Sequence, residues 1–266
     1  MIDGSTRVFA ILGDPVAHSL SPTMHNAAFQ ALGLAAAYVP LRCAVQDVPQ
    51  LMRALAMAGG GGNVTVPHKE VAARSVDGPS ARVRLLGACN TFWADDGAVC
   101  GDNTDVAGVA AALDALEPPE GPWLILGTGG GARAAADAAR DRGTAVSVVS
   151  RSADRKQRFE GWVRGVGIDQ APAAECTVVI NATPLGLAQT DPLPIDQPPP
   201  RAVVAFDMVY APGETSWVRA MRAAGLRASD GRTMLVAQGA AAFRCWFSGK
   251  HPPLDVMRAA VDAALR

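Results

Sequence analysis

An apolar strand that leads directly into a glycine-rich turn is the feature that most constrains how this chain folds. Trp123-Leu-Ile-Leu126 precedes Gly127-Thr-Gly-Gly-Gly-Ala132, and helical spacing follows from Arg133 to Arg142. The turn matches G-x-G-x-x-A: the first glycine permits a tight turn, the second lets the backbone approach a pyrophosphate, and the small last residue lets helix and strand pack closely. The helix N-terminus adds amide donors and a positive dipole end. We therefore predict a dinucleotide site formed by Gly127, Thr128, Gly129, Gly130, Gly131 and Ala132.

The residues after the next strand indicate which dinucleotide binds. We expect the strand Ala145–Val149 to end beside the adenosine ribose, where an NAD site usually carries Asp or Glu. This chain has Ser150-Arg151-Ser152 there, followed by Arg155. A guanidinium suits a 2′-phosphate because it offers charge and planar hydrogen-bond donors. NADP is therefore favoured; ordinary surface arginines are the structural alternative, and Asp154 keeps NAD as a weaker one.

The first half of the chain alternates short apolar runs with helical segments, a pattern typical of α/β proteins. Ser21-Pro22 predicts a helix start, with serine as the N-cap and proline at the first helical position. Asp95-Asp-Gly97 lies between two strand-like runs and predicts a hairpin. The predicted strands are Val8–Leu12, Tyr38–Leu41, Asn63–Val66, Ala88–Trp93 and Ala98–Gly101, and a second helix is predicted over Asp47–Met57.

Beyond Asp105 the alternation continues through the glycine turn. Helices are predicted over Val106–Leu116, Arg133–Arg142, Thr233–Phe247 and Leu254–Leu265, and strands over Trp123–Leu126, Ala145–Val149, Thr177–Ile180 and Ala202–Phe206. The length of 266 residues suits one large or two ordinary domains. We predict an α/β protein of two domains, an α/β substrate domain followed by a Rossmann-like, doubly wound nucleotide domain. The pattern alone leaves open whether the final helices return to the first domain.

Composition excludes several classes of partner. The formal net charge is −1, with no basic stripe for a nucleic-acid backbone and no polybasic segment for a membrane surface. No apolar run approaches the roughly 18 residues of a membrane span, and the start does not resemble a signal peptide. The four histidines and five cysteines show no zinc-ligand spacing, and no C-x-x-C pair occurs. We expect a cytoplasmic protein with no metal site that binds neither nucleic acid nor membrane.

Several polar side chains suit a small, hydroxylated acid. Alternate residues of a strand share a face, so Asn63 and Thr65 point the same way, toward a cleft or a solvated surface. Ser19 and Ser21 stand at a helix N-terminus, which suits a carboxylate, although Ser21 is explained equally well as an N-cap. Asn90 adds an amide at the end of a strand. Such side chains reject analogues that lack the matching hydroxyl groups.

Lys69 and Asp105 are the candidates for acid–base chemistry. Lys69 is one of three lysines in a chain whose other basic side chains are nearly all arginine, and an amine can cycle a proton whereas a guanidinium effectively cannot. A Tyr-x-x-x-Lys pair is excluded as the proton donor of a ketone reduction, because Arg42 and Glu214 lie four residues after the two tyrosines. The bland alternatives are a surface lysine after a strand and a carboxylate that stabilises a helix dipole.

Eight short segments form a more specific pattern than any one of them. They are Gly13–Asn26, Asn63–Lys69, Gly87–Thr91, Gly101–Asp105, Gly127–Arg133, Asn181–Pro184, Asp207–Tyr210 and Met234–Gln238. In this order they resemble the shikimate dehydrogenase family nearly end to end. The resemblance implies an NADP-dependent oxidoreductase that reversibly reduces 3-dehydroshikimate to shikimate in aromatic amino-acid biosynthesis.

The resemblance also assigns roles. It implies that Lys69 and Asp105 form the catalytic pair. It implies that the substrate is bound by Ser19, Ser21, Asn63, Thr65, Asn90, Tyr210 and Gln238, and the cofactor by Gly127 to Ala132 with Ser150, Arg151, Ser152 and Arg155. The family's fold implies a substrate domain of residues 1–105 plus 235–266, and an inserted NADP-binding domain of residues 106–234.

Alternatives to this function stay open. Quinate and aminoshikimate dehydrogenases share most of these motifs. A non-catalytic, metabolite-sensing protein on the same fold is a different class of function, but it would be expected to lose the lysine–aspartate pair that this chain keeps. Either a monomer or a homodimer is consistent with the sequence.

Overall fold

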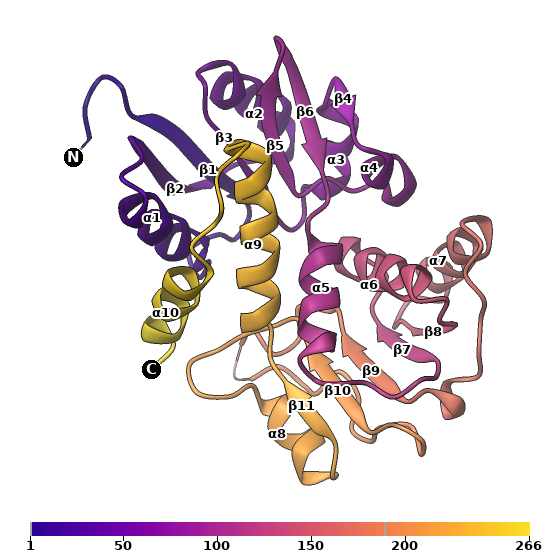
Figure 1. The fold of residues 1–266 in the computed structure, drawn as a ribbon. Coiled ribbons are helices and arrows are strands. Elements are labelled where there is room, and N and C mark those ends of the chain that lie inside the picture. The colour runs from indigo at the N-terminus through magenta and orange to yellow at the C-terminus, as the bar shows by residue number, and fades with distance from the viewer. Residues whose placement is uncertain (1, 189) are drawn as a thin grey trace. The chain divides into compact units, whose positions relative to one another are not determined.

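Two β-sheets organise the chain, one in each of two units (Figure 1). This computed structural model describes residues 2–188 and 190–266. The first unit takes in the residues up to Asp105 together with Leu235–Ala264, and the second takes in Val106–Met234 with Leu265–Arg266. The chain therefore leaves the first unit after Asp105 and returns to it within one late helix.

The first unit is built on a mixed sheet of six strands in the order β2-β1-β3-β5-β6-β4. Its strands are β1 (Arg7–Gly13), β2 (Ala36–Arg42), β3 (Gly61–Val64), β4 (Gly78–Pro79), β5 (Thr91–Asp95) and β6 (Ala98–Asp102). β1 pairs in parallel with β2 and β3, whereas β5 pairs antiparallel with β3 and β6. Asp96 and Gly97 join β5 to β6 with positive φ values of 46° and 77°, so the predicted hairpin is confirmed.

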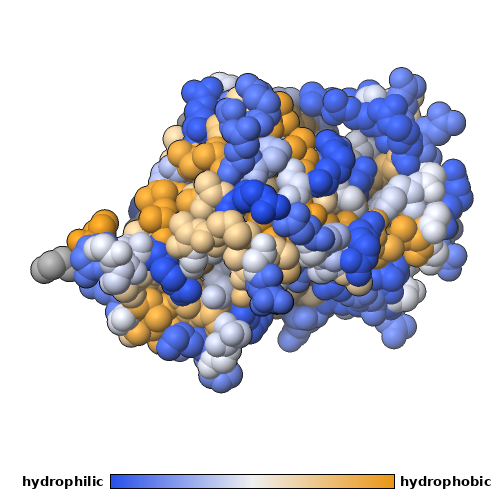
Figure 2. All heavy atoms as spheres, turned by 90° about the horizontal axis from the view of Figure 1, so that it is seen from above, coloured by the Kyte–Doolittle hydropathy of each residue, from blue (hydrophilic) through white to orange (hydrophobic). Residues whose placement is uncertain are grey.

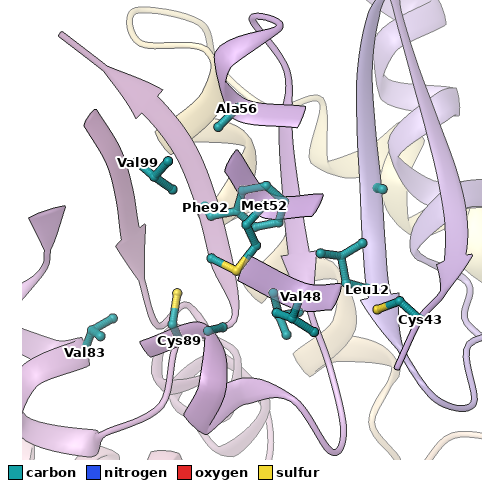
Figure 3. Close-up of a cluster of buried hydrophobic side chains, with 12 residues drawn as sticks. Leu12, Cys43, Val48, Met52, Ala56, Val83, Cys89, Phe92 and Val99 are labelled. Carbon is teal, nitrogen blue, oxygen red and sulfur yellow. The ribbon is translucent and has the colours of Figure 1, made fainter. Parts of the chain in front are cut away.

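Helices of the first unit pack on both faces of this sheet. They are α1 (Ser21–Ala31), α2 (Val48–Met57), α3 (Lys69–Ser75), α4 (Ala81–Leu86), the part of α9 (Arg232–Trp246) from Leu235 onward, and α10 (Leu254–Ala264). On the α2 face, Met52 and Phe92 are fully buried beside one another (Figure 3). Each such side chain stabilises the fold by roughly 1.5–3 kcal/mol.

Aromatic side chains fill the opposite face. The ring of Phe9 lies 5.4 Å from that of Phe29, 5.0 Å from that of Trp246 and 5.4 Å from that of Phe247. Two of these four rings come from the end of α9 and the residue after it, about 240 residues after β1. The late return of the chain thus completes the core of the first unit.

Glycines explain why β3 begins earlier than the sequence predicts. The strand was predicted over residues 63–66, because four glycines before Asn63 resemble a loop; the observed strand is Gly61–Val64. β3 lies between β1 and β5, and a Cβ atom on Gly60 or Gly62 would lie 1.8 Å from the Val8 carbonyl oxygen or 2.0 Å from that of Ala10. Close approach of neighbouring backbones therefore requires glycine here.

The second unit is a five-stranded parallel sheet in the order β11-β10-β9-β7-β8. Its strands are β7 (Trp123–Leu126), β8 (Val146–Val149), β9 (Val178–Asn181), β10 (Val204–Asp207) and β11 (Arg227–Ser229), and its helices are α5 (Asp105–Asp114, from Val106 onward), α6 (Gly130–Asp141), α7 (Ala153–Gly165) and α8 (Ser216–Ala223). The strand order reverses at β7, which is the position where doubly wound folds bind their ligand. The predicted fold class is confirmed.

Some helices were not predicted, and one of them changes the position of a candidate residue. α3, α4, α7 and α8 were not assigned from the sequence, because α3, α4 and α8 are short and α7 is largely polar. Lys69 was placed at the end of a strand, but it is the first residue of α3, five positions after β3 ends. Asn90 was also placed at a strand end, whereas it directly precedes β5.

The surface mixes polar and apolar residues. On the face shown in Figure 2, hydrophilic and hydrophobic residues are interspersed, and exposed apolar side chains such as Val8, Val39 and Val66 occur over the described surface. Of the helices formed by residues 2–188 and 190–266, none combines the length and apolar character needed to cross a bilayer.

Candidate functional site

Lys69 and Asp105 form an ion pair in the first unit. Lys69 Nζ lies 2.5 Å from Asp105 Oδ2, and the two side chains are 16% and 6% exposed. Each residue is the first of a helix, α3 and α5, and each helix follows a strand of the same sheet. The two residues lie 36 positions apart in the sequence, and both side chains have little exposure to water. The pair therefore differs from an ordinary surface ion pair, in which both side chains are exposed to solvent.

Neighbouring amide groups fix the Asp105 carboxylate. Asn90 Nδ2 donates to Asp105 Oδ1 at 2.9 Å, and Asn90 Oδ1 accepts from the Thr104 amide at 2.7 Å. Asn103 Oδ1 accepts from the Asp105 amide at 3.1 Å. Both carboxylate oxygens therefore have a donor, Asn90 at one and Lys69 at the other, and the carboxylate cannot rotate freely.

Asn63 joins this cluster from the central strand. It is 4% exposed, and its Nδ2 donates to the Asn90 carbonyl oxygen at 3.0 Å. Its Oδ1 accepts from the Tyr38 hydroxyl at 2.7 Å. Thr65 follows β3, and its amide bonds to the Leu12 carbonyl oxygen at 2.8 Å.

Sequence reasoning missed Tyr38. It lies in a predicted strand and is 2% exposed, so it resembles an ordinary core residue. Burial raises the pKa of Tyr38 well above its usual value, while a hydrogen bond with the Ser21 side chain acts in the opposite direction. Tyr38 is therefore a neutral phenol. The available signal was rarity, because the chain has only two tyrosines.

Ser21 does not cap its helix, contrary to the prediction. α1 begins at Ser21, its N-cap is Leu20, and Pro22 lies in the first turn. The local pattern Ser-Pro fits either register, because proline is tolerated at both of the first two helical positions. Ser19 Oγ accepts from the Ser21 amide at 3.3 Å. Ser21 is 4% exposed, and its hydroxyl is thus freed from capping and hydrogen-bonds to Tyr38 instead.

Two further candidates for the substrate side come from later parts of the chain. Gln238 lies in the part of α9 that belongs to the first unit, and its Nε2 donates to the Leu235 carbonyl oxygen at 2.9 Å. Tyr210 belongs to the second unit and lies three residues beyond β10. The structure therefore connects Lys69, Asp105, Asn90, Asn63 and Ser21 through side-chain hydrogen bonds and the Asn90 backbone, with Tyr38 between the last two.

The glycine turn follows β7, the strand at which the order of the second sheet reverses. Gly127 has φ 110°, and a Cβ atom there would lie 3.0 Å from the Ala182 carbonyl oxygen, so glycine is required. Gly129 is the N-cap of α6, and a Cβ atom there would meet open space. α6 begins at Gly130 rather than at Arg133 as predicted, so the amides of its first turn lie within the glycine turn. This arrangement can seat a pyrophosphate.

The two candidate arginines stand at the end of the neighbouring strand. Arg151 and Arg155 flank the start of α7, and both are exposed. Ser152 is the N-cap of that helix, with its Oγ accepting from the Arg155 amide at 3.4 Å, and Ser150 Oγ accepts from the Ser152 amide at 3.3 Å. Side-chain guanidinium groups and a helix N-terminus together suit a phosphate.

A buried carboxylate, also missed, holds the loops beside the glycine turn. Asp207 Oδ1 accepts from Asn181 Nδ2 at 2.8 Å and from the Val209 amide at 3.0 Å, and its Oδ2 accepts from the Thr215 hydroxyl at 2.8 Å. Burial raises the pKa of Asp207 to about 6 despite these donors. Asn181 and Asp207 end adjacent strands, and that register was the signal.

Within residues 2–188 and 190–266, no group of three or more His, Cys, Asp or Glu side chains is arranged to hold a metal ion. The second unit is a doubly wound sheet with a glycine turn at its switch point, and the first holds a lysine–aspartate pair among buried amides and hydroxyls. Together they define a two-domain dehydrogenase that uses a nicotinamide dinucleotide.

Comparison with known proteins identifies the particular family. A model of the shikimate dehydrogenase substrate binding domain matches residues 11–92, and one of the shikimate 5′-dehydrogenase C-terminal domain matches residues 231–261. Proteins named shikimate dehydrogenase (NADP(+)) from Methanothermobacter thermautotrophicus and Methanothrix thermoacetophila are 37% and 41% identical, covering 100% and 97% of this chain and 99% and 98% of their own. The chain belongs to the shikimate dehydrogenase family, as the eight segments predicted.

A solved structure agrees over nearly the same length. Shikimate 5-dehydrogenase from Thermus thermophilus, in complex with NADP(H) and shikimate, is 38% identical with a TM-score of 0.86. The comparison covers 97% of this chain and 99% of that one.

Proposed function

We propose that this chain is an NADP-dependent shikimate dehydrogenase that reversibly reduces 3-dehydroshikimate to shikimate, with Lys69 and Asp105 as its catalytic residues. The observation that carries the proposal is their ion pair of 2.5 Å, held among buried amides in a chain that belongs to this family along its whole length. A metabolite-sensing protein has no need of a proton donor at this place, so the pair favours catalysis over binding alone.

Lys69 supplies the proton of the reaction. NADPH, when bound, supplies the hydride that adds to the carbonyl carbon of the substrate. Negative charge then develops on the substrate oxygen, and an ammonium beside it stabilises that charge and donates a proton. Lys69 has three N–H groups and directs one of them to Asp105, which leaves others for the substrate oxygen.

Asp105 keeps that amine in place during reduction. Its Oδ2 accepts from Lys69 and its Oδ1 accepts from Asn90, so the carboxylate holds a fixed orientation. In the reverse direction, Lys69 takes up the proton of the substrate hydroxyl. We infer that Asp105 also accepts a hydrogen bond from that hydroxyl, which gives it both an orienting and a binding role.

The polar residues of the first unit bind the rest of the substrate in this proposal. Ser19 and Ser21 bind the carboxylate at the start of α1, where the helix dipole favours an anion. Asn63, Thr65, Asn90 and Gln238 bind the ring hydroxyl groups, and Tyr210 of the second unit contributes to the same function.

The second unit binds NADP. The amides of the turn formed by Gly127 to Ala132 bind the pyrophosphate, since Gly127 permits the tight turn with a positive φ of 110° and a Cβ atom on Gly129 would meet open space. Ser150, Arg151, Ser152 and Arg155 bind the 2′-phosphate at the start of α7. The five cysteines carry free thiols, which fits the reducing cytoplasm as the place of action. A monomer or a homodimer is expected.

A steady-state assay tests the function directly. Shikimate and quinate are each oxidised with NADP or NAD, by the wild type and by Lys69→Ala. We expect the highest kcat/KM for the wild type with shikimate and NADP, and a large loss in the variant. Higher kcat/KM with quinate would assign the chain to the quinate branch of the family. No turnover of any substrate by folded wild-type protein would refute an enzymatic function.

A further inference from the structure

We propose that Tyr38 is a positioning residue for this reaction, because its hydroxyl fixes the orientation of the Asn63 amide and so leaves one Asn63 N–H group directed at the substrate. The inference rests on the proposed function, in which Asn63 binds a ring hydroxyl. Tyr38 lies in the edge strand β2 and affects substrate binding by orienting Asn63, without touching the substrate itself.

Tyr38 is held on every side. Asn26 of α1 donates from its Nδ2 to the Tyr38 carbonyl oxygen at 2.8 Å, and its Oδ1 accepts from the Tyr38 amide, also at 2.8 Å. The ring stacks on that of His25, with centroids 4.7 Å apart, and lies 5.9 Å from the Trp246 ring. Backbone and ring are therefore both fixed, and the hydroxyl has a defined position.

Strand register brings that hydroxyl to Asn63. Phe9 of β1 pairs with Tyr38 on one side and with Gly61 of β3 on the other. Side chains in one such row point to the same face, and Asn63 lies two residues beyond Gly61 on that face. A side chain as long as tyrosine spans β1 diagonally, which gives the distance of 2.7 Å between Tyr38 Oη and Asn63 Oδ1.

Counting protons assigns the direction of each hydrogen bond. The Asn90 backbone carbonyl oxygen can only accept, so the atom of Asn63 that faces it at 3.0 Å is Nδ2. Oδ1 then faces Tyr38, whose single proton must be donated to it. One N–H group of the Asn63 amide remains, and it is a donor. The substrate oxygen bound there must act as an acceptor.

The Ser21 contact follows from the same count. The proton of Tyr38 is directed to Asn63, so in its hydrogen bond with Tyr38 the Ser21 hydroxyl donates. A bound carboxylate would compete for that donor and turn the Ser21 proton toward itself. The Tyr38 hydroxyl thus accepts a hydrogen bond from Ser21, which we assign to the substrate carboxylate, and donates one to Asn63, which we assign to a ring hydroxyl.

A double-mutant cycle isolates the route through Asn63. The variants are Tyr38→Phe, Asn63→Ala and the double variant, and KM for shikimate and kcat are measured at saturating NADP. Tyr38→Phe keeps the ring packing and removes only the hydroxyl. The loss of one hydrogen bond should raise KM roughly 2- to 12-fold with a smaller change in kcat, because Lys69 and Asp105 are untouched.

In the Asn63→Ala background, Tyr38→Phe should raise KM by a factor at least about three times smaller than in the wild-type background. The reason is that the residue which Tyr38 positions is gone. Asn63→Ser replaces Asn63→Ala if the latter does not fold. Ser75→Ala removes a partly buried hydroxyl elsewhere in the first unit, which donates to the Val71 carbonyl oxygen, and should leave both constants unchanged.

The outcomes separate the two proposals. If Tyr38→Phe raises KM equally in both backgrounds, or not at all in the wild-type background, the positioning role is refuted while the proposed function stands. If the wild type is folded and oxidises none of the substrates, the proposed function is refuted and the role of Tyr38 in it falls with it.

Discussion

The buried imidazole of His25 predicts that the first unit loses stability in mild acid. His25 is fully buried in α1, stacks on Tyr38 and has its ring centroid 4.8 Å from that of Trp246. Among the described residues neither of its ring nitrogens has a hydrogen-bond partner. Burial therefore lowers the pKa of His25 from 6.5 to about 3.

The sign and size of the effect follow from these two values. Between pH 6.5 and about 3 the unfolded chain binds a proton at this position that the folded chain does not bind. The contribution of the neutral imidazole to stability is therefore complete above pH 6.5 and is lost progressively as the pH falls. The loss is roughly 2 kcal/mol at pH 5 and approaches about 5 kcal/mol below pH 3.

Urea denaturation between pH 5 and 8 measures the loss. Unfolding is followed by tryptophan fluorescence, because Trp246 contacts His25 and reports on this unit. Replacement of His25 by leucine, which does not titrate, should reduce the fall in unfolding free energy between pH 8 and pH 5 by roughly 2 kcal/mol. The matched control is His251→Leu, because the His251 side chain is exposed in the folded protein. Equal pH dependence for wild type and the His25→Leu variant would refute the reasoning.

Three further predictions concern the proposed active site. Lys69→Ala should lower kcat about 10²- to 10⁴-fold while substrate still binds, and Lys69→Arg should rescue little; near-normal turnover in stopped-flow assays would contradict the mechanism. Arg151→Ala should lower the affinity for NADP by roughly one to two decades and the affinity for NAD far less, as titrations with both cofactors would measure. An equal loss of affinity for both cofactors would mean that Arg151 has a structural role only. Ser21→Ala should raise KM for shikimate more than it changes kcat, and it should cost roughly 0.5–1.5 kcal/mol of stability because the hydrogen bond with Tyr38 is lost while the N-cap is kept; an unchanged KM in a folded variant would remove Ser21 from the carboxylate site.

Local patterns were sufficient wherever the physical cause is local. The apolar strand β7 and its glycine turn were located from the sequence because a tight turn, a close backbone approach and a helix start all depend on neighbouring residues. The hairpin at Asp96 and Gly97 was found for the same reason, since positive φ values restrict residue choice at those positions. Family and cofactor followed from several such motifs in order.

Errors arose where one local pattern has two solutions. Ser21-Pro22 fits a serine N-cap, and it fits equally a helix that begins at the serine. Glycines before Asn63 fit a loop, and they also fit a strand between two close neighbours, which is what β3 is. In both cases the choice depends on contacts with other strands, and these contacts are not encoded within the segment itself.

The part of the site that sequence reasoning missed is the part built by strand register. Tyr38 meets Asn63 because β2, β1 and β3 pair in parallel with one particular alignment, and a shift of one residue would turn the tyrosine to the α2 face. Asp207 meets Asn181 through the parallel pairing of β9 with β10. Although Asn63, Asn181 and Asp207 belong to the recognised segments, neither contact can be predicted from them, because its two residues lie 25 and 26 positions apart in separate strands. Lys69, Asn90 and Asp105 lie in short motifs that the sequence makes recognisable, whereas Tyr38, which contacts Asn63 from a buried strand, emerges only when the sheet is assembled.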